Sequence, residues 1–215
     1  GMETFQSASA LIAARKPEKP IIGLRPHAAG RAARWFLSHF QGDVAYAYKA
    51  NSTPFLIGAL YGAGIRHFDV ASLPELKDAK TIPDATFHFM HPVKSRHAIR
   101  RAFLLGCRSF SLDSEDELKK IVDETGGATD LSLWVRIAVP AINAIIPLEN
   151  KFGITGAAAV RLLMKTRQAA KSRRAGPCLW LPKRVLLPRE LRGLASLRFG
   201  FGIRGLRACR PLLLE

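Results

Sequence analysis

Cysteine is scarce in this chain, whose 215 residues include only Cys107, Cys178 and Cys209. The three are too widely spaced for a disulfide framework or a zinc site, so we expect no metal and a reducing compartment, the cytoplasm. Long apolar runs are missing as well. The longest, residues 138–147, is far shorter than the ~20 residues that a membrane-spanning helix needs. Since no basic leader precedes an apolar segment, we expect neither a membrane protein nor a signal peptide.

Acidic residues are few relative to basic ones, and the imbalance is concentrated at one end of the chain. The whole sequence has 33 Lys and Arg against 17 Asp and Glu, a net charge of +16. Residues 1–172 hold 23 basic and 15 acidic side chains, whereas residues 173–215 hold 10 and 2. We therefore distinguish a leader at 1–19, beginning with the cloning remnant Gly1-Met2, a domain at 20–172, and a basic tail at 173–215.

The basic tail also has no Asp, Asn, Thr, Tyr, Met, His or Gln. This composition is typical of a GC-rich gene read in the wrong frame, so we expect the tail to be frameshifted or disordered. Gly200, Gly202 and Gly205 match the dinucleotide-binding pattern G-x-G-x-x-G, but the strand, helix and acidic residue that should accompany it are missing. The arginines are not interleaved with aromatic residues, so we expect non-specific adhesion to polyanions and no specific binding of nucleic acid.

Between the leader and the tail, short β-type runs alternate with segments of helical spacing. The β-type runs lie at 44–49, 66–70, 86–89, 108–112 and 131–137, and the helical segments at 54–62, 73–80, 95–105, 114–124 and 155–170. This alternation predicts an α/β fold of parallel strands joined by right-handed crossovers. Five visible units suit either an incomplete (β/α)8 barrel of the TIM type or a doubly wound open sheet. Because no glycine-rich turn follows the first strand, we favour the incomplete barrel.

Two local patterns refine this prediction. Ser114 is a capping residue for the helix at 114–124, because a glutamate follows three residues later. Another helix is expected at 27–40, before the first β-type run. One stripe of that helix holds Ala32, Trp35, Phe36 and His39, and we expect it to pack against the first strand.

A lysine and a carboxylate stand at the ends of the first two β-type runs. Lys49 closes the run at 44–49, and Asp69 closes the run at 66–70. In a β/α barrel, the carboxyl ends of the strands share one mouth, so we expect both side chains to point into it. A lysine that is partly withdrawn from water can lose its proton and form a Schiff base with a carbonyl. This is the arrangement that a pyridoxal-phosphate enzyme needs.

Six motifs in register extend this interpretation to a family. They are Tyr-Ala-Tyr-Lys-Ala-Asn at 46–51, Phe-Asp-Val-Ala-Ser at 68–72, Pro-Val-Lys at 92–94, Leu-Asp-Ser-Glu-Asp-Glu-Leu at 112–118, Val-Arg-Ile at 135–137 and Lys-Phe-Gly at 151–153. Together they resemble the pyridoxal-phosphate-dependent ornithine/diaminopimelate/arginine decarboxylases, whose fold is an alanine-racemase-like barrel with a β domain. The Asp-Val-Ala-Ser and Pro-Val-Lys variants are most similar to the ornithine/lysine branch.

The resemblance implies roles for three residues of the first two strands. Lys49 would hold the cofactor as a Schiff base and later move protons. Ala47, two residues earlier on the same face, would lie against the cofactor ring, and Asp69 would steady the charge of the Schiff base. From the residues alone, Lys49 could also be a solvated charge, and Asp69 could cap the helix that follows it.

Three further residues receive a role from the resemblance. Glu75 and Arg136 would support the cofactor ring and its hydroxyl, and Lys151 would lie near the interface of a homodimer. From the residues alone, Glu75 could equally be a first-turn acid favoured by the helix dipole, and Arg136 an ion pair on the barrel floor. His88 and His91 could form a metal pair, but we favour packing because no thiol or carboxylate ligand stands beside them.

The resemblance ends near residue 172, before the family's later parts: a histidine-bearing strand, a glycine-rich phosphate loop and the β domain. It implies a pyridoxal-phosphate-dependent carboxy-lyase acting on a basic amino acid towards polyamines. Ornithine is the preferred substrate, and lysine or arginine are alternatives. We expect this chain to be truncated and impaired. The competing hypotheses are a non-catalytic homologue that binds and modulates a full-length decarboxylase, and a small barrel that only carries pyridoxal phosphate.

Overall fold

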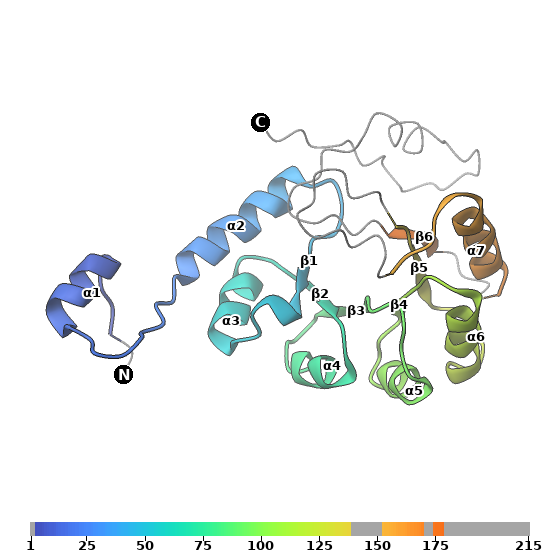
Figure 1. Ribbon diagram of the computed structural model, residues 1–215, viewed down its shortest axis with the longest axis horizontal. Helices are drawn as coiled ribbons and strands as arrows, with labels where there is room; N and C mark the ends of the chain where they lie inside the picture. The colour runs from blue at the N-terminus through green and yellow to red at the C-terminus, as the bar shows by residue number, and fades with distance from the viewer. Residues whose placement is uncertain (1–2, 139–151, 170–173, 179–215) are drawn as a thin grey trace.

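The computed structural model describes residues 3–138, 152–169 and 174–178. Within these ranges, a six-stranded parallel sheet has the order β1–β2–β3–β4–β5–β6 (Figure 1). The strands are β1 (Ala45–Ala47), β2 (His67–Val70), β3 (Thr86–Phe89), β4 (Ser109–Leu112), β5 (Ser132–Arg136) and β6 (Arg174–Cys178). A doubly wound sheet reverses its strand order at a switch point, whereas a barrel adds each strand beside the last. The sequential order therefore confirms the incomplete (β/α)8 barrel.

Helices alternate with the strands along the chain (Figure 1). They are α3 (Pro54–Gly62), α4 (Leu73–Ala79), α5 (Arg96–Leu104), α6 (Glu115–Glu124) and α7 (Gly156–Ala169), and each coincides with a predicted helical segment. Two more helices, α1 (Ala8–Arg15) and α2 (Pro26–His39), precede the first strand. The helix α1 was not expected; it has no buried residue and lies away from the sheet in Figure 1.

Serine side chains define where three of these helices begin. The hydroxyls of Ser72, Ser95 and Ser114 accept hydrogen bonds from the backbone N–H three residues later, at 3.3, 3.1 and 3.2 Å. These bonds satisfy N–H groups that have no partner inside the helix. The predicted capping role of Ser114 is thus confirmed.

The hydrophobic core lies between the sheet and its covering helices. Every second strand residue faces this core: Phe68, Val70, Phe89, Phe110, Leu112, Leu133 and Val135 are buried. Helix residues Leu76, Ile99, Ile121 and Leu162 belong to the same cluster. Because successive side chains of a strand point to opposite faces, the polar residues between these positions share the other face, the interior of the barrel. The site described below is built on that inner face.

Helix α2 packs differently from the prediction. Trp35 and Phe36 of the predicted stripe are 38% and 51% exposed, whereas the buried residues of α2 are Gly30 and Ala33. The helix lies against α3 rather than β1, and a Cβ added to Gly30 would stand 3.9 Å from that of Ala63. The prediction followed large apolar side chains, but the helices approach each other through small ones.

The barrel extends past the boundary that we predicted at residue 172. The strand β6 pairs with β5 in parallel register, from Ser132↔Arg174 to Arg136↔Cys178. Its pairing uses backbone groups, so the unusual side-chain composition of the segment gave no sign of it. The rest of the basic tail, including the glycine pattern at 200–205, lies outside the described residues.

None of the helices in the described ranges is long and apolar enough to cross a membrane. In the same ranges, no three or more His, Cys, Asp or Glu side chains gather where a metal ion could bind. The two histidines of the β3 region take part in separate contacts. His88 Nδ1 lies 2.8 Å from Ser109 Oγ, whereas His91 Nδ1 accepts a hydrogen bond from the Val93 N–H at 3.2 Å. These contacts agree with packing roles.

Candidate functional site at the carboxyl ends of the strands

Lys49 follows the carboxyl end of β1, in the short turn η1 (Tyr48–Ala50). The neighbouring Tyr48 is buried, and its hydroxyl donates to Asp78 Oδ2 of α4 at 2.5 Å. Burial and this carboxylate raise the pKa of Tyr48 to about 12, so the hydroxyl stays a donor at neutral pH. The turn is thereby tied to α4. Lys49 itself is exposed, contrary to the expectation that it would be partly withdrawn from water.

Asp69 lies on the inner face of β2, at the centre of the candidate site. It pairs in register with Ala47 of β1 on one side and with His88 of β3 on the other. The capping alternative for Asp69 is wrong, because Ser72 is the residue that caps α4. Ala47, the register neighbour of Asp69 on β1, carries only a methyl group.

Charged groups from three elements act on Asp69. Its pKa is raised to about 6, chiefly because the carboxyl is buried and further because Glu75 is close. Lys49 and Arg136 act in the opposite direction, as does a hydrogen bond from the backbone of Met90. Asp69 therefore changes its charge close to neutral pH. Lys49 of η1, Glu75 of α4 and Arg136 of β5 are near enough to one carboxyl to influence its titration.

Glu75 has a structural contact besides this influence on Asp69. It lies in the first turn of α4, and its Oε2 accepts a hydrogen bond from the Ala71 N–H at 2.8 Å. The first-turn role that the sequence left open is thus present. Its carboxylate nevertheless stays close enough to raise the pKa of Asp69.

Arg136 ends β5 and lies at the mouth of the barrel. Its guanidinium carbon is 5.3 Å from the ring centroid of Phe152, and its charge lowers the pKa of Asp69. The alternative of an ion pair on the barrel floor is therefore wrong. Lys151, which the resemblance assigns to a dimer interface, lies outside the described residues.

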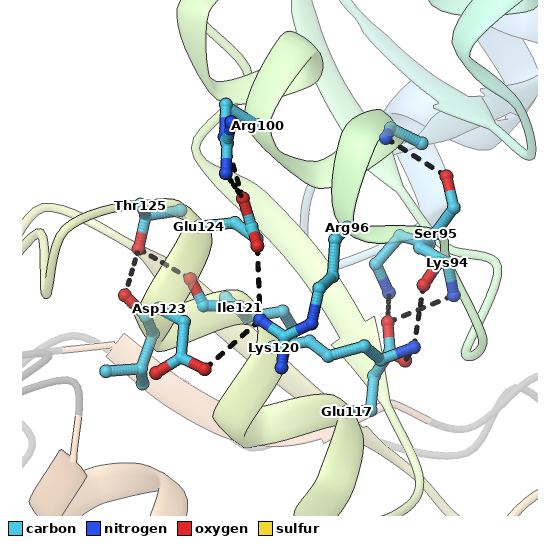
Figure 2. A network of polar contacts seen from close by, with 12 residues as sticks. Lys94, Ser95, Arg96, Arg100, Glu117, Lys120, Ile121, Asp123, Glu124 and Thr125 are labelled. Atoms are coloured by element: carbon cyan, nitrogen blue, oxygen red, sulfur yellow. Dashed lines mark hydrogen bonds and ion pairs between the residues drawn. The ribbon is translucent and has the colours of Figure 1, made fainter.

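Beside the mouth, the structure contains a buried charge network that sequence reasoning did not identify (Figure 2). Lys94 Nζ lies 2.9 Å from Glu117 Oε1 and donates to the backbone oxygens of His91 and Ser111 at 2.9 and 2.6 Å. Lys120 Nζ contacts the other Glu117 oxygen at 2.5 Å. Lys94 belongs to the motif at 92–94 and Glu117 to the motif at 112–118, so both residues stood out in the sequence. The sequence did not indicate that they contact each other.

A second polar row crosses the inner face below the mouth. The rings of His67 and His88 are joined at 3.0 Å, and Ser109 Oγ lies 2.8 Å from both His88 Nδ1 and Trp134 Nε1. Burial lowers the pKa of His88 to about 4, and the neighbouring His67 adds to the effect. His88 is therefore neutral at pH 7. Polar residues at every second strand position were the sequence signal for this row.

Comparison with known proteins agrees with this geometry. Residues 27–173 match the model of the pyridoxal-dependent decarboxylase family, pyridoxal binding domain. The chain is also 35% identical over 131 residues to a lysine/ornithine decarboxylase of Selenomonas ruminantium, a match that covers 60% of this chain and 32% of that protein. The chain thus spans about a third of the length of this curated relative.

Solved structures share the fold. The crystal structure of an SrLDC mutant in complex with PLP matches with a TM-score of 0.72 and 27% identity, covering 86% of this chain and 48% of that one. A lysine/ornithine decarboxylase from Vibrio vulnificus, complexed with putrescine, matches with a TM-score of 0.69, covering 88% of this chain and 50% of that one. At 21% identity, the second similarity supports the fold alone.

Proposed function

This chain belongs to the family of pyridoxal-dependent decarboxylases, and from this premise we propose that it binds pyridoxal phosphate through Lys49 and serves the decarboxylation of a basic amino acid. Ornithine is the preferred substrate, with lysine and arginine as alternatives, on a route towards polyamines. The similarity to a lysine/ornithine decarboxylase supports the substrate class. A homodimer and a cytoplasmic location are part of the same proposal. The observation that carries it is the gathering of Lys49, Glu75 and Arg136 around Asp69.

The residues at the mouth fit this cofactor. Lys49 offers a primary amine for the aldehyde, and Ala47 leaves room on the inner face for a flat ring. Asp69 can gain or lose a proton near neutral pH, because its pKa is about 6. When bound, pyridoxal phosphate supplies an electron sink that allows an amino acid to lose its α-carboxylate.

Each of these side chains has a separate task in the proposed reaction. Lys49 holds the cofactor, yields its place to the substrate amine, and carries a proton on Nζ. The ionised Asp69 carboxylate stabilises positive charge on the nitrogen that Lys49 and the substrate exchange. Glu75 raises the pKa of Asp69 and Arg136 lowers it, so together they keep that carboxyl poised near neutral pH.

Two other functions compete with this proposal: a protein that carries pyridoxal phosphate without turnover, and a homologue that binds and modulates a full-length decarboxylase. Release of carbon dioxide from ornithine, lysine and arginine distinguishes an enzyme from both alternatives. A carrier binds the cofactor through Lys49 without such release, and a pure modulator does not bind the cofactor.

The test is cofactor titration of the full chain followed by borohydride reduction and peptide mapping. Wild type should develop an absorption band of bound pyridoxal phosphate, with the reduced adduct on Lys49. Lys49→Ala should lose both, because it removes the lysine whose charge acts on Asp69. Lys119→Ala, which removes an exposed lysine of α6, is the matched control and should behave as wild type. An adduct spread evenly over surface lysines would contradict the proposal.

A further inference from the structure

The segment 152–155 is fixed against the carboxyl end of β5. The Ile154 N–H donates to the Arg136 carbonyl at 3.0 Å, and the Ala138 N–H donates to the Ile154 carbonyl at 3.1 Å. These bonds form a parallel bridge between Ile137 and Ile154. The backbone on both sides of Arg136 is therefore held by a segment that lies beyond the strand itself.

Gly153 lets this segment approach so closely. Its φ of +106° lies in the region that favours glycine, and an added Cβ would stand only 2.7 Å from the Ala138 nitrogen. The Gly153 N–H donates to Asp113 Oδ2 at 2.9 Å, which anchors the segment to the end of β4. Asp113 belongs to the motif at 112–118, and it has no role in the proposed function.

Phe152 lies between two side chains of the mouth. Its ring contacts the His91 ring edge to face, with centroids 5.3 Å apart, and the guanidinium carbon of Arg136 lies 5.3 Å from its centroid. A guanidinium at this distance from an aromatic ring is attracted by the electron density of the ring face. Phe152 thus connects the ends of β3 and β5.

The buried charge network supports the other side of this arrangement (Figure 2). Lys94 Nζ donates to the carbonyls of His91 and Ser111, so it ties the ends of β3 and β4 together. His91 carries the ring that contacts Phe152, and Asp113 lies two residues after Ser111. The buried Lys94 ammonium group therefore fixes the two places on which the 152–155 segment rests. These are the end of β3, which is followed by His91, and the end of β4, which is followed by Asp113.

We propose that Phe152 is a positioning residue, which holds the guanidinium of Arg136 at the mouth so that its charge acts on Asp69. Asp113 and Gly153 set the place of Phe152, and His91 contacts its ring edge to face. The inference rests on the proposed function only for the role of Arg136 toward the cofactor. The position of the guanidinium is a property of the cofactor-free protein.

The first test is therefore made without cofactor, by carbon NMR titration of the Asp69 carboxyl, assigned with Asp69→Asn. In the wild-type protein, the Asp69 carboxyl should titrate with a pKa of about 6, because Lys49, Glu75 and Arg136 act on it. Phe152→Leu keeps an apolar side chain but removes the ring, so it should raise this pKa by roughly half a unit. Phe103→Leu is the matched control, since Arg108 lies 4.0 Å from the Phe103 ring, away from the mouth.

Further variants separate positioning from a general loss of structure. Asp113→Ala should raise the Asp69 pKa as Phe152→Leu does, and Asp113→Asn, which keeps an acceptor for the Gly153 N–H, should restore it. In an Arg136→Gln background, Phe152→Leu should have no further effect. The inference is overturned if Phe152→Leu leaves the Asp69 titration unchanged, or shifts it equally when Arg136 is replaced.

Cofactor affinity provides the second readout. If wild type forms the Lys49 adduct, Phe152→Leu should raise the Kd for pyridoxal phosphate about fivefold, while Phe103→Leu leaves it unchanged. An unchanged Kd together with an unchanged Asp69 titration overturns the role of Phe152. If wild type binds no cofactor, the proposed function fails, but the NMR titration still decides whether Phe152 positions Arg136.

Discussion

Lys94 and Glu117 are opposite charges enclosed between β3, β4 and α6. Their side chains are 1% and 2% exposed, and Nζ lies 2.9 Å from Oε1 (Figure 2). Burial lowers the pKa of Lys94, while the attraction of Glu117 opposes that effect. Two backbone carbonyls complete the hydrogen bonding of the ammonium group. Such a pair tolerates the loss of one member poorly, because without Lys94 the buried Glu117 carboxylate keeps only Lys120, at 2.5 Å, as a cationic partner within the described residues.

We therefore expect Lys94→Met to lower the free energy of unfolding by about 3–5 kcal/mol, measured by urea denaturation. The double variant Lys94→Met with Glu117→Leu should recover part of this loss, because neither charge then remains in the interior. Lys119→Met, at an exposed position of α6, serves as the control and should change stability by less than about 0.5 kcal/mol. A loss below about 1 kcal/mol for Lys94→Met would show that Lys120 alone balances the charge of Glu117.

At the scale of the elements, the helices differ in how much their N-terminal caps contribute to the stability of the whole protein. Ser114 caps α6, which buries Glu117, Leu118 and Ile121 in the core. Ser7 caps α1 in the same way, accepting from the Ala10 N–H at 3.1 Å, but α1 has no buried residue. The same hydrogen bond therefore belongs to a cooperative unit in one case and to a peripheral helix in the other.

Ser114→Ala should accordingly lower the free energy of unfolding by about 1 kcal/mol, the usual contribution of a serine cap. Ser7→Ala should leave the main unfolding transition unchanged and only reduce the helicity of α1. Thermal and urea unfolding followed by tryptophan fluorescence and by circular dichroism measure both effects. Equal destabilisation by the two substitutions would mean that α1 packs on the barrel in solution.

Most strands and helices of the barrel were predictable from sequence, because each coincides with a clear periodic pattern of apolar residues. Apolar residues at every second position mark the strands, and the helices carry apolar stripes with serine caps. The errors fall where other forces decide. Helix α2 packs through Gly30 and Ala33, which carry little hydrophobic signal, and β6 joins the sheet through its backbone.

For the candidate site, strand ends placed Lys49 and Asp69 at one mouth without any structure, whereas Arg136 received its role only from the family resemblance. Phe152 was missed because its contacts join residues far apart in the chain, such as His91, and depend on a glycine turn. The Lys94–Glu117 pair was missed for the same reason. A periodic pattern indicates on which face a side chain lies, but it does not indicate which residue of another element it contacts.

At the scale of the whole molecule, two half-buried groups of the inner face, Asp69 and His88, respond oppositely to pH. The pKa of Asp69 is raised from 3.8 to about 6, so its burial contributes stability below about pH 4 that is lost as pH rises through 6. The pKa of His88 is lowered from 6.5 to about 4, so it contributes stability above about pH 6.5 that is lost as pH falls through 4. Each contribution is about 3 kcal/mol over its full range.

The two contributions should nearly cancel in the wild-type protein between pH 4 and 6.5. Asp69→Asn leaves the His88 contribution, so its free energy of unfolding should fall on acidification from pH 7 to 4, relative to wild type, by about 3 kcal/mol. His88→Gln should show the opposite trend with a similar magnitude. Urea unfolding at unit steps of pH measures both. Parallel pH profiles for all three proteins would contradict the opposing burial of the two groups.

The sequential strand order allows the sheet to form strand by strand during synthesis of the protein. Each strand pairs with the one before it, so the growing sheet can form while the ribosome is still adding residues. Lys49 is synthesised early, but Arg136 and then Phe152 follow about 90 and 100 residues later, roughly 5–20 seconds at ordinary translation rates. A nascent chain therefore carries Lys49 for that time without the residues that complete its site.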